Sequence, residues 1–187
     1  IIKHYTNCLI NSRSCYSIPL NKTLINNVSN IIKNIKNHQN YTFIDFGSGY
    51  GNILYHFKDI FNKLIGIELN KGSHNEALNL LKNYNNISLL NMSMEDYVFP
   101  NTDIILYMYE PLFELKCNDR TILYKKIIKN LSKSNNKVYI IYIRANMIAN
   151  ILNNCFYNNE IFEEDFKLVS KKNSSIWPFN RIIYILE

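Results

Sequence analysis

The hydrophobic residues of this chain occur either at helical spacing or in short apolar runs typical of strands, and the alternation of the two predicts the order of its helices and strands. Residues 20–36 place leucine, isoleucine and valine at helical spacing, which predicts an amphipathic helix. Short apolar runs then predict strands over residues 42–46, 63–68, 87–91, 103–109 and 138–143. Helical patterns separate most of these runs, at residues 52–61, 73–84 and 120–132. Strands that alternate with long helices predict an α/β fold with a doubly wound, mostly parallel sheet.

The end of the chain has a different pattern. A helix is expected over residues 145–155, followed by strands at 166–170 and 181–186. Because no helical pattern separates the last two strands, we expect an antiparallel hairpin that completes a seven-stranded sheet, with helices on both faces. Trp177, just before Pro178, is expected to anchor this hairpin by hydrophobic contact.

Length and composition predict a single domain. The 187 residues contain no proline-rich linker or repeat, and 47% of them are hydrophobic. Residues 1–40 are expected to form a loop and helix packed on the core, and residues 41–187 the main body of the domain. No apolar run reaches the roughly 18 residues that a membrane helix needs.

Charge and cysteine spacing bear on location and partners. Cys8, Cys15, Cys117 and Cys155 are far apart and read as reduced thiols, so we expect an intracellular protein, cytoplasmic or nuclear, and not a secreted one. No cysteine and histidine combine at zinc-ligand spacing, so no metal is expected. The net charge of +6 favours an acidic partner such as nucleic acid or a nucleosome face. An A/T-rich coding sequence would enrich lysine equally well.

Three alternating glycines are the strongest chemical signal. Asp45, Gly47, Gly49 and Gly51 form an acid-x-G-x-G-x-G run between an apolar strand and a helical pattern. Glycine permits positive φ and a close approach of the backbone to a ligand. Glu68 stands seventeen residues after Gly51, at the end of the next strand, where a carboxylate can accept hydrogen bonds from both hydroxyls of a ribose. The simpler interpretation is a tight strand-to-helix turn without a ligand.

This run resembles motif I of the class I S-adenosylmethionine-dependent methyltransferases, which have a Rossmann-like fold. It differs from the G-x-G-x-x-G of dinucleotide-binding proteins, which makes a nicotinamide oxidoreductase a distant alternative. The resemblance implies S-adenosyl-L-methionine as cofactor, with the glycine loop beside its amino-acid half and the acid on its ribose. The implied cofactor-binding residues in this part of the chain are Asp45, Gly47, Ser48, Gly49, Gly51, Asn52, Glu68 and Leu69. Tyr16, before the first helix, is expected to fold over the cofactor.

The resemblance also predicts an adenine contact after the third strand. The family usually has an Asp near the position of Ser93, and the next residue meets the adenine ring through its backbone N–H. Met94 would make that contact, and Glu95 or Asp96 would accept from the exocyclic amine. The alternative is an acidic, solvated start of a loop.

A second motif follows the fourth strand, where residues 107–113 read Tyr-Met-Tyr-Glu-Pro-Leu-Phe. This resembles the Tyr-Asn-Pro-Phe form of motif IV in a group of small class I methyltransferases, over residues 41–187, with Glu110 in place of the Asn. Glu110 and Tyr109 are the expected catalytic residues, since a carboxylate there can accept hydrogen bonds from an amine or take its proton. Tyr107 is expected beside the cofactor. A salt bridge or helix cap at Glu110, and plain packing of the tyrosines, remain alternatives, and Arg144 would meet an acidic substrate or pair with Glu110.

The preferred function is methyl transfer to a nitrogen nucleophile. Residues 66–70, Gly-Ile-Glu-Leu-Asn, resemble the corresponding segment of DOT1-like lysine methyltransferases, so a protein lysine, including one on a histone, is favoured. The chain lacks the basic tail and Asn-rich motif IV of those enzymes. A small-molecule or RNA methyltransferase is the alternative enzyme. A catalytically silent binding subunit is the alternative outside enzymes, and the intact glycine loop argues against it.

Overall fold

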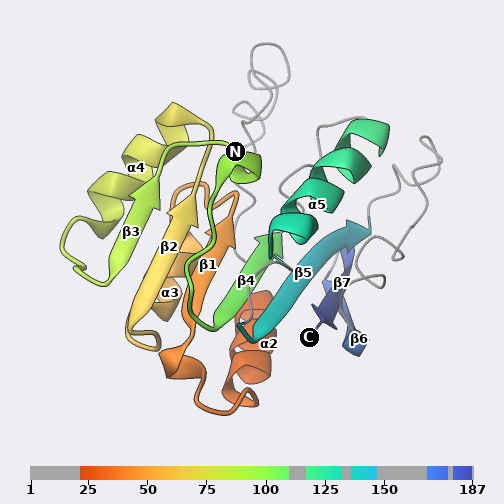
Figure 1. The fold of residues 1–187 in the computed structure, drawn as a ribbon. Coiled ribbons are helices and arrows are strands. Elements are labelled where there is room, and N and C mark those ends of the chain that lie inside the picture. Colours follow the sequence, from red (N-terminus) through yellow and green to blue (C-terminus); the bar gives the residue numbers. More distant parts are fainter. Residues whose placement is uncertain (1–21, 110–116, 132–135, 147–167, 177–178, 187) are drawn as a thin grey trace.

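The computed structural model describes residues 22–109, 117–131, 136–146, 168–176 and 179–186, which form a seven-stranded sheet flanked by helices (Figure 1). The strands are β1 (Thr42–Phe46), β2 (Lys63–Ile67), β3 (Ile87–Leu90), β4 (Ile104–Tyr109), β5 (Val138–Asn146), β6 (Leu168–Ile176) and β7 (Phe179–Leu186). The helices are α2 (Lys22–Lys33), α3 (Asn52–Phe57), α4 (Lys71–Leu81) and α5 (Cys117–Leu131). Within these residues, no helix is long and apolar enough to span a bilayer.

The order of the strands creates a switch point near the middle of the sheet. Across Figure 1 the order is β3-β2-β1-β4-β5-β7-β6. The first five strands of this order pair in parallel with their neighbours, whereas β7 pairs antiparallel with β5 and with β6. The predicted doubly wound α/β fold with its parallel sheet is therefore confirmed. In such a sheet ligands bind beyond the carboxyl ends of the strands where the order reverses, which here is between β1 and β4.

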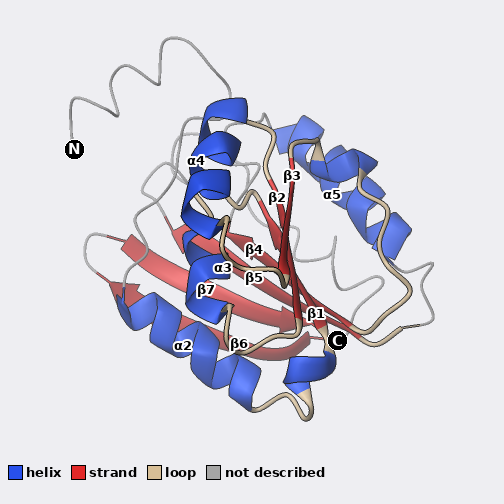
Figure 2. Cartoon of the chain, turned by 90° about the vertical axis from the view of Figure 1, so that its left-hand side faces the viewer, coloured by secondary structure: helices blue, strands red, loops and turns tan. Residues whose placement is uncertain are grey.

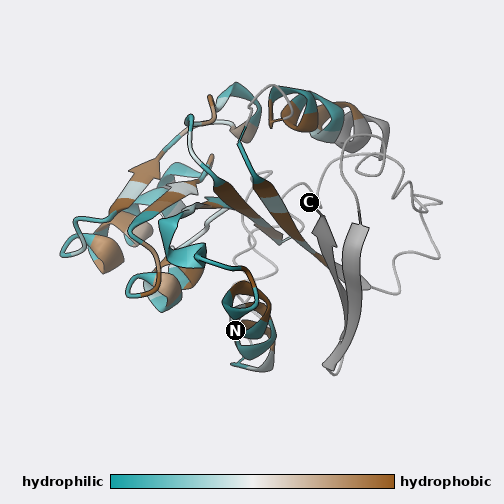
Figure 3. Ribbon diagram, turned by 60° about the horizontal axis from the view of Figure 1, so that its bottom comes forward, coloured by the Kyte–Doolittle hydropathy of each residue, from teal (hydrophilic) through white to brown (hydrophobic). Residues whose placement is uncertain are grey.

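Helices cover both faces of the sheet (Figure 2). Helices α2, α3 and α4 lie on one side, and α5 lies on the other. Side chains alternate along β1 accordingly: Phe43 belongs to the cluster under α2 and α3, and Ile44 to the cluster under α5. In Figure 3 the helices carry both hydrophilic and hydrophobic residues, as expected of amphipathic helices that cover a sheet on one side only.

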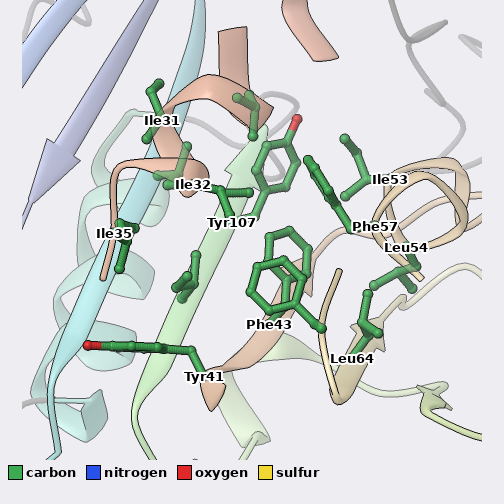
Figure 4. Packing of buried hydrophobic residues seen from close by; sticks show 14 of the residues in the cluster. Ile31, Ile32, Ile35, Tyr41, Phe43, Ile53, Leu54, Phe57, Leu64 and Tyr107 are labelled. Carbon is green, nitrogen blue, oxygen red and sulfur yellow. The ribbon is translucent and has the colours of Figure 1, made fainter. Parts of the chain in front are cut away.

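Aromatic rings make up the centre of the core on the α2–α4 side (Figure 4). The ring centroid of Phe43 lies 5.2 Å from that of Phe57, 4.9 Å from that of Phe61 and 6.0 Å from that of Tyr107. Full burial of such a side chain stabilises the fold by about 1.5–3 kcal/mol. The helix α2 joins the same cluster through the residues Leu24, Val28, Ile31 and Ile32.

Several predicted helix boundaries are wrong. Helices α2 and α4 each end three residues before the expected residues 36 and 84. The helix expected over residues 145–155 does not begin at Ala145, because Ala145 and Asn146 continue β5 and pair with Arg181 and Asn180 of β7. Backbone pairing with a distant strand overrides local preference there. The helix expected over residues 52–61 ends at Phe57, four residues early. Residues 147–155 and Trp177 lie outside the described residues.

Candidate functional site

The glycine loop after β1 adopts a backbone that other residues rarely take. The φ angles of Gly47, Gly49 and Gly51 are 75°, 53° and 77°. An L side chain is strained in this region, so the alternating glycines follow from the shape of the turn. Asn52 begins α3 directly after it.

The loop is tied to the end of β2. The backbone N–H groups of Gly47 and Ser48 both donate to the carbonyl of Ile67, at 2.9 and 3.1 Å. Within the loop, the N–H of Gly51 donates to the carbonyl of Ser48 at 2.9 Å. The carboxyl end of β2 therefore helps to fix the backbone of the loop that follows β1.

Glu68 closes this junction with its side chain. Its Oε2 accepts from the N–H of Gly49 at 2.8 Å, and its Oε1 accepts from the N–H of Asn70 at 2.7 Å. The residue is 8% exposed. A carboxylate has about four acceptor positions, so these two bonds leave capacity for further donors. The structure thus brings together the predicted residues of the loop and the predicted acid.

Asp45, two residues before Gly47, is a buried acid. It is 3% exposed and stands in β1 between Gly66 of β2 and Tyr107 of β4. Burial, and secondarily the charge of Glu68, raises the pKa of Asp45 from 3.8 to about 8. The neutral form is favoured until a positive charge comes near, because a nearby cation stabilises the carboxylate.

Two glycines leave room for close packing, and the predicted cofactor contact of Gly51 stays a prediction. A Cβ on Gly51 would lie 2.6 Å from Cδ1 of Leu81 in α4, so this position lets α3 pack closely on α4. A Cβ on Gly66 would lie 2.5 Å from Cδ1 of Leu54 and 2.9 Å from Oγ of Ser48. Gly66 therefore makes room for the loop above β2. The sequence pattern did not single out this role, since it depends on contacts between distant segments.

The hydroxyl of Ser48 is buried under the loop. Its Oγ has no hydrogen-bond partner among the residues that the structure describes. Such a group costs about 1–3 kcal/mol when it stays unpaired. Within the same residues, no cluster of His, Cys, Asp and Glu could hold a metal ion.

Leu69 and the residues predicted to contact adenine lie in two environments. Leu69 follows Glu68 and is 62% exposed, so its side chain can contact a ligand. Met94 and Glu95 lie in a short 3-10 helix, Met94–Asp96. Met94 packs against the core on the α5 side, and the carboxylate of Glu95 lies 3.2 Å from Nζ of Lys126 in α5. The adenine contact of Met94 and Glu95 and the cofactor contact of Leu69 stay predictions.

The predicted catalytic segment is only partly described. Tyr107 is 1% exposed and its ring stacks on Phe43 (Figure 4), so it belongs to the core next to Asp45. Tyr109 is half-buried at the end of β4, on the same face of the sheet. Glu110 and Tyr16 lie outside the described residues. Arg144 is placed in β5 by its backbone alone. The roles of these residues stay predictions.

Two asparagines around Glu68 were not singled out by the sequence pattern. Asn70 caps α4, because its Oδ1 accepts from the N–H of Ser73 at 2.9 Å. Asn91 follows β3, and its Nδ2 donates to the carbonyls of Glu68 and Leu69 at 2.7 and 3.0 Å. The only local signal for either is an asparagine at or near the end of a predicted strand.

Comparisons with known proteins place the fold. No family model and no curated protein matches the sequence. Among solved structures, the N-methyltransferase NodS from Bradyrhizobium japonicum, in complex with S-adenosyl-L-homocysteine, is similar with a TM-score of 0.71 at 12% identity, over 98% of this chain and 96% of that one. A putative RNA methyltransferase from Pyrococcus horikoshii is similar with a TM-score of 0.70 at 14% identity, over 95% of this chain and 88% of that one. A SAM-dependent methyltransferase from Leishmania major is similar with a TM-score of 0.65 at 18% identity, over 87% of this chain and 71% of that one.

These similarities concern the fold. At identities of 12–18% they show a shared architecture and leave the chemistry to the residues of this chain. The chain has the fold of class I S-adenosylmethionine-dependent methyltransferases.

Proposed function

We propose that this chain is a methyltransferase that uses S-adenosyl-L-methionine. The observation that carries the proposal is the position of Glu68, whose carboxylate is bonded to the glycine loop at the switch point of the sheet. Nucleotide-like ligands bind at this place in doubly wound folds. The similarity in fold to NodS in complex with S-adenosyl-L-homocysteine supports the same cofactor.

The chemistry of the described residues fits this cofactor. Glu68 keeps acceptor capacity for the two ribose hydroxyls beyond its bonds to Gly49 and Asn70. Asp45 is a buried acid two residues before the loop, with a pKa of about 8, which a cationic ligand would lower. Leu69 offers an exposed apolar surface next to Glu68. The cofactor, when bound, supplies an electrophilic methyl group on a positively charged sulfur.

For the acceptor we propose a nitrogen nucleophile, with a protein lysine as the first candidate. The similarity in fold to the N-methyltransferase NodS supports nitrogen. Glu110 would accept hydrogen bonds from the amine or take its proton, and Tyr109 would help to orient it, because methyl transfer depends on in-line positioning. RNA is the second candidate, supported by the net charge of +6 and by the likeness to the putative RNA methyltransferase.

Calorimetric titration with S-adenosylmethionine tests the cofactor. We expect the wild type to bind and Glu68→Ala to lose detectable binding while it stays folded, because the ribose hydroxyls lose their acceptor. Glu76→Ala, which removes an exposed carboxylate from α4, is the matched control and should bind as the wild type does. Absence of wild-type binding at high micromolar cofactor would favour a silent methyltransferase fold. Unchanged affinity in Glu68→Ala would refute the ribose role.

A labelled-methyl transfer assay tests the acceptor. Cell extract is separated into protein, RNA and metabolite fractions, and each is incubated with the enzyme and methyl-labelled cofactor. Label in protein that survives ribonuclease and maps to lysine would support the first candidate. Label in RNA would replace it with the second, and label in the metabolite fraction would point to a small molecule.

A further inference from the structure

The segment that carries Glu68 is held from the side of β3. Nδ2 of Asn91 donates to the backbone carbonyl of Glu68 at 2.7 Å and to that of Leu69 at 3.0 Å. Directly beside it, the N–H of Glu68 donates to the carbonyl of Leu90 at 3.1 Å. One amide thus bridges two consecutive peptide groups at the point where the chain leaves β2.

The exposure of Asn91 makes this arrangement informative. The residue is exposed, and an exposed amide can satisfy its hydrogen bonds with water at little cost. Here the amide nitrogen instead spans two protein carbonyls, so Asn91 fixes the orientation of the two peptide groups that follow Glu68. The Glu68 side chain starts from this fixed segment and reaches the N–H of Gly49 at 2.8 Å.

We propose that Asn91 is a positioning residue for nucleoside binding. It holds the backbone of Glu68 so that the carboxylate stays on the glycine loop and presents its remaining acceptor positions to the ribose hydroxyls. The inference rests on the proposed function, because it assumes a nucleoside ligand at Glu68. Asn91 itself acts through Glu68, so its loss should weaken binding of the nucleoside half of the cofactor.

The chain contains a matched control at the opposite end of β3. Asn86 precedes β3, and its Nδ2 also donates to two backbone carbonyls, those of Lys58 and Phe61, at 2.7 and 2.9 Å. Asn86→Ala therefore removes the same kind of bridge from a place away from the glycine loop. It should lower stability without changing ligand affinity.

The test measures binding of adenosine and of S-adenosylhomocysteine to the wild type, Asn91→Ala and Asn86→Ala, together with their melting temperatures. We expect Asn91→Ala to weaken both ligands about fivefold, the equivalent of one hydrogen bond. Asn86→Ala should bind both as the wild type does. Equal affinities for the wild type and Asn91→Ala would overturn the inference, and so would an equal loss in Asn86→Ala.

A double-mutant cycle with Glu68→Gln separates positioning from general destabilisation. If Asn91 acts through Glu68, then Asn91→Ala should change affinity little in the Glu68→Gln background. The same fivefold loss in both backgrounds would contradict the inference. If the wild type binds and Glu68→Ala does not, but Asn91→Ala binds normally, the inference fails and the proposed function stands. If the wild type binds neither ligand, both fail.

Discussion

The substitution Asp45→Asn should remove a pH-dependent loss of stability. Burial, and then the charge of Glu68, raises the pKa of Asp45 in the folded protein to about 8, whereas the ordinary value is 3.8. Between these two pH values the folded protein keeps a proton that the unfolded chain has released. The folded state binds more protons there, so its stability falls as the pH rises through this window and levels off above it.

The size of the effect follows from the shift. Each pKa unit corresponds to about 1.36 kcal/mol, and about three units of the window lie below neutral pH. Ionisation in the unfolded chain therefore lowers the stability of the wild type by about 4 kcal/mol between pH 4 and pH 7. Asparagine has nearly the same shape and does not titrate. The difference in unfolding free energy, Asp45→Asn minus wild type, should rise by that amount over the same range.

Urea unfolding at a series of pH values measures this difference. All other titrating groups are common to the two proteins, so their contributions cancel if the fold is kept. A change in polar contacts at position 45 shifts the difference by a constant, which does not affect its slope. A difference that stays level within about 1 kcal/mol from pH 4 to pH 7 would refute the reasoning, because it would mean that Asp45 titrates alike in both states.

Three further substitutions test the loop and the acceptor side. Gly51→Ala should lower the unfolding free energy by about 1–3 kcal/mol, because its φ is positive and the new Cβ would meet Leu81; wild-type stability in urea unfolding would contradict this. Ser48→Ala should leave the melting temperature equal or higher, since it removes a buried hydroxyl without a partner among the described residues. A clear decrease would reveal a bonded water. Glu110→Gln should lower kcat more than cofactor affinity, and unchanged turnover would make Glu110 structural.

The predictable part of the fold is the part that local sequence encodes. The first strand was predicted over residues 42–46, the bounds that β1 has in the structure. Its apolar run is buried on both faces and stops at a glycine turn, so both ends are marked by neighbouring residues. The glycine loop and Glu68 were predicted for the same reason, because strand, turn and acid follow each other at fixed spacing.

Contacts between distant segments account for what the sequence did not show. Ala145 and Asn146 extend β5 because β7 pairs with them, and no residue nearby announces that partner. Gly66 is needed because Leu54 and the Ser48 hydroxyl occupy the space that a side chain would take. Features that depend on contacts between distant segments could therefore not be predicted from the local sequence pattern.

The same distinction explains why Glu68 has a structural role besides the ligand role that the motif predicts. The motif gives it one task, to meet a ribose. In the structure the carboxylate also joins the end of β2 to the glycine loop after β1, through the N–H of Gly49. A loop held in this way loses less conformational freedom when a ligand binds, so more of the interaction energy remains for affinity. The acid is thus both a part of the proposed ligand site and one of the groups that hold the loop, so we expect loop order and ligand affinity both to depend on this side chain.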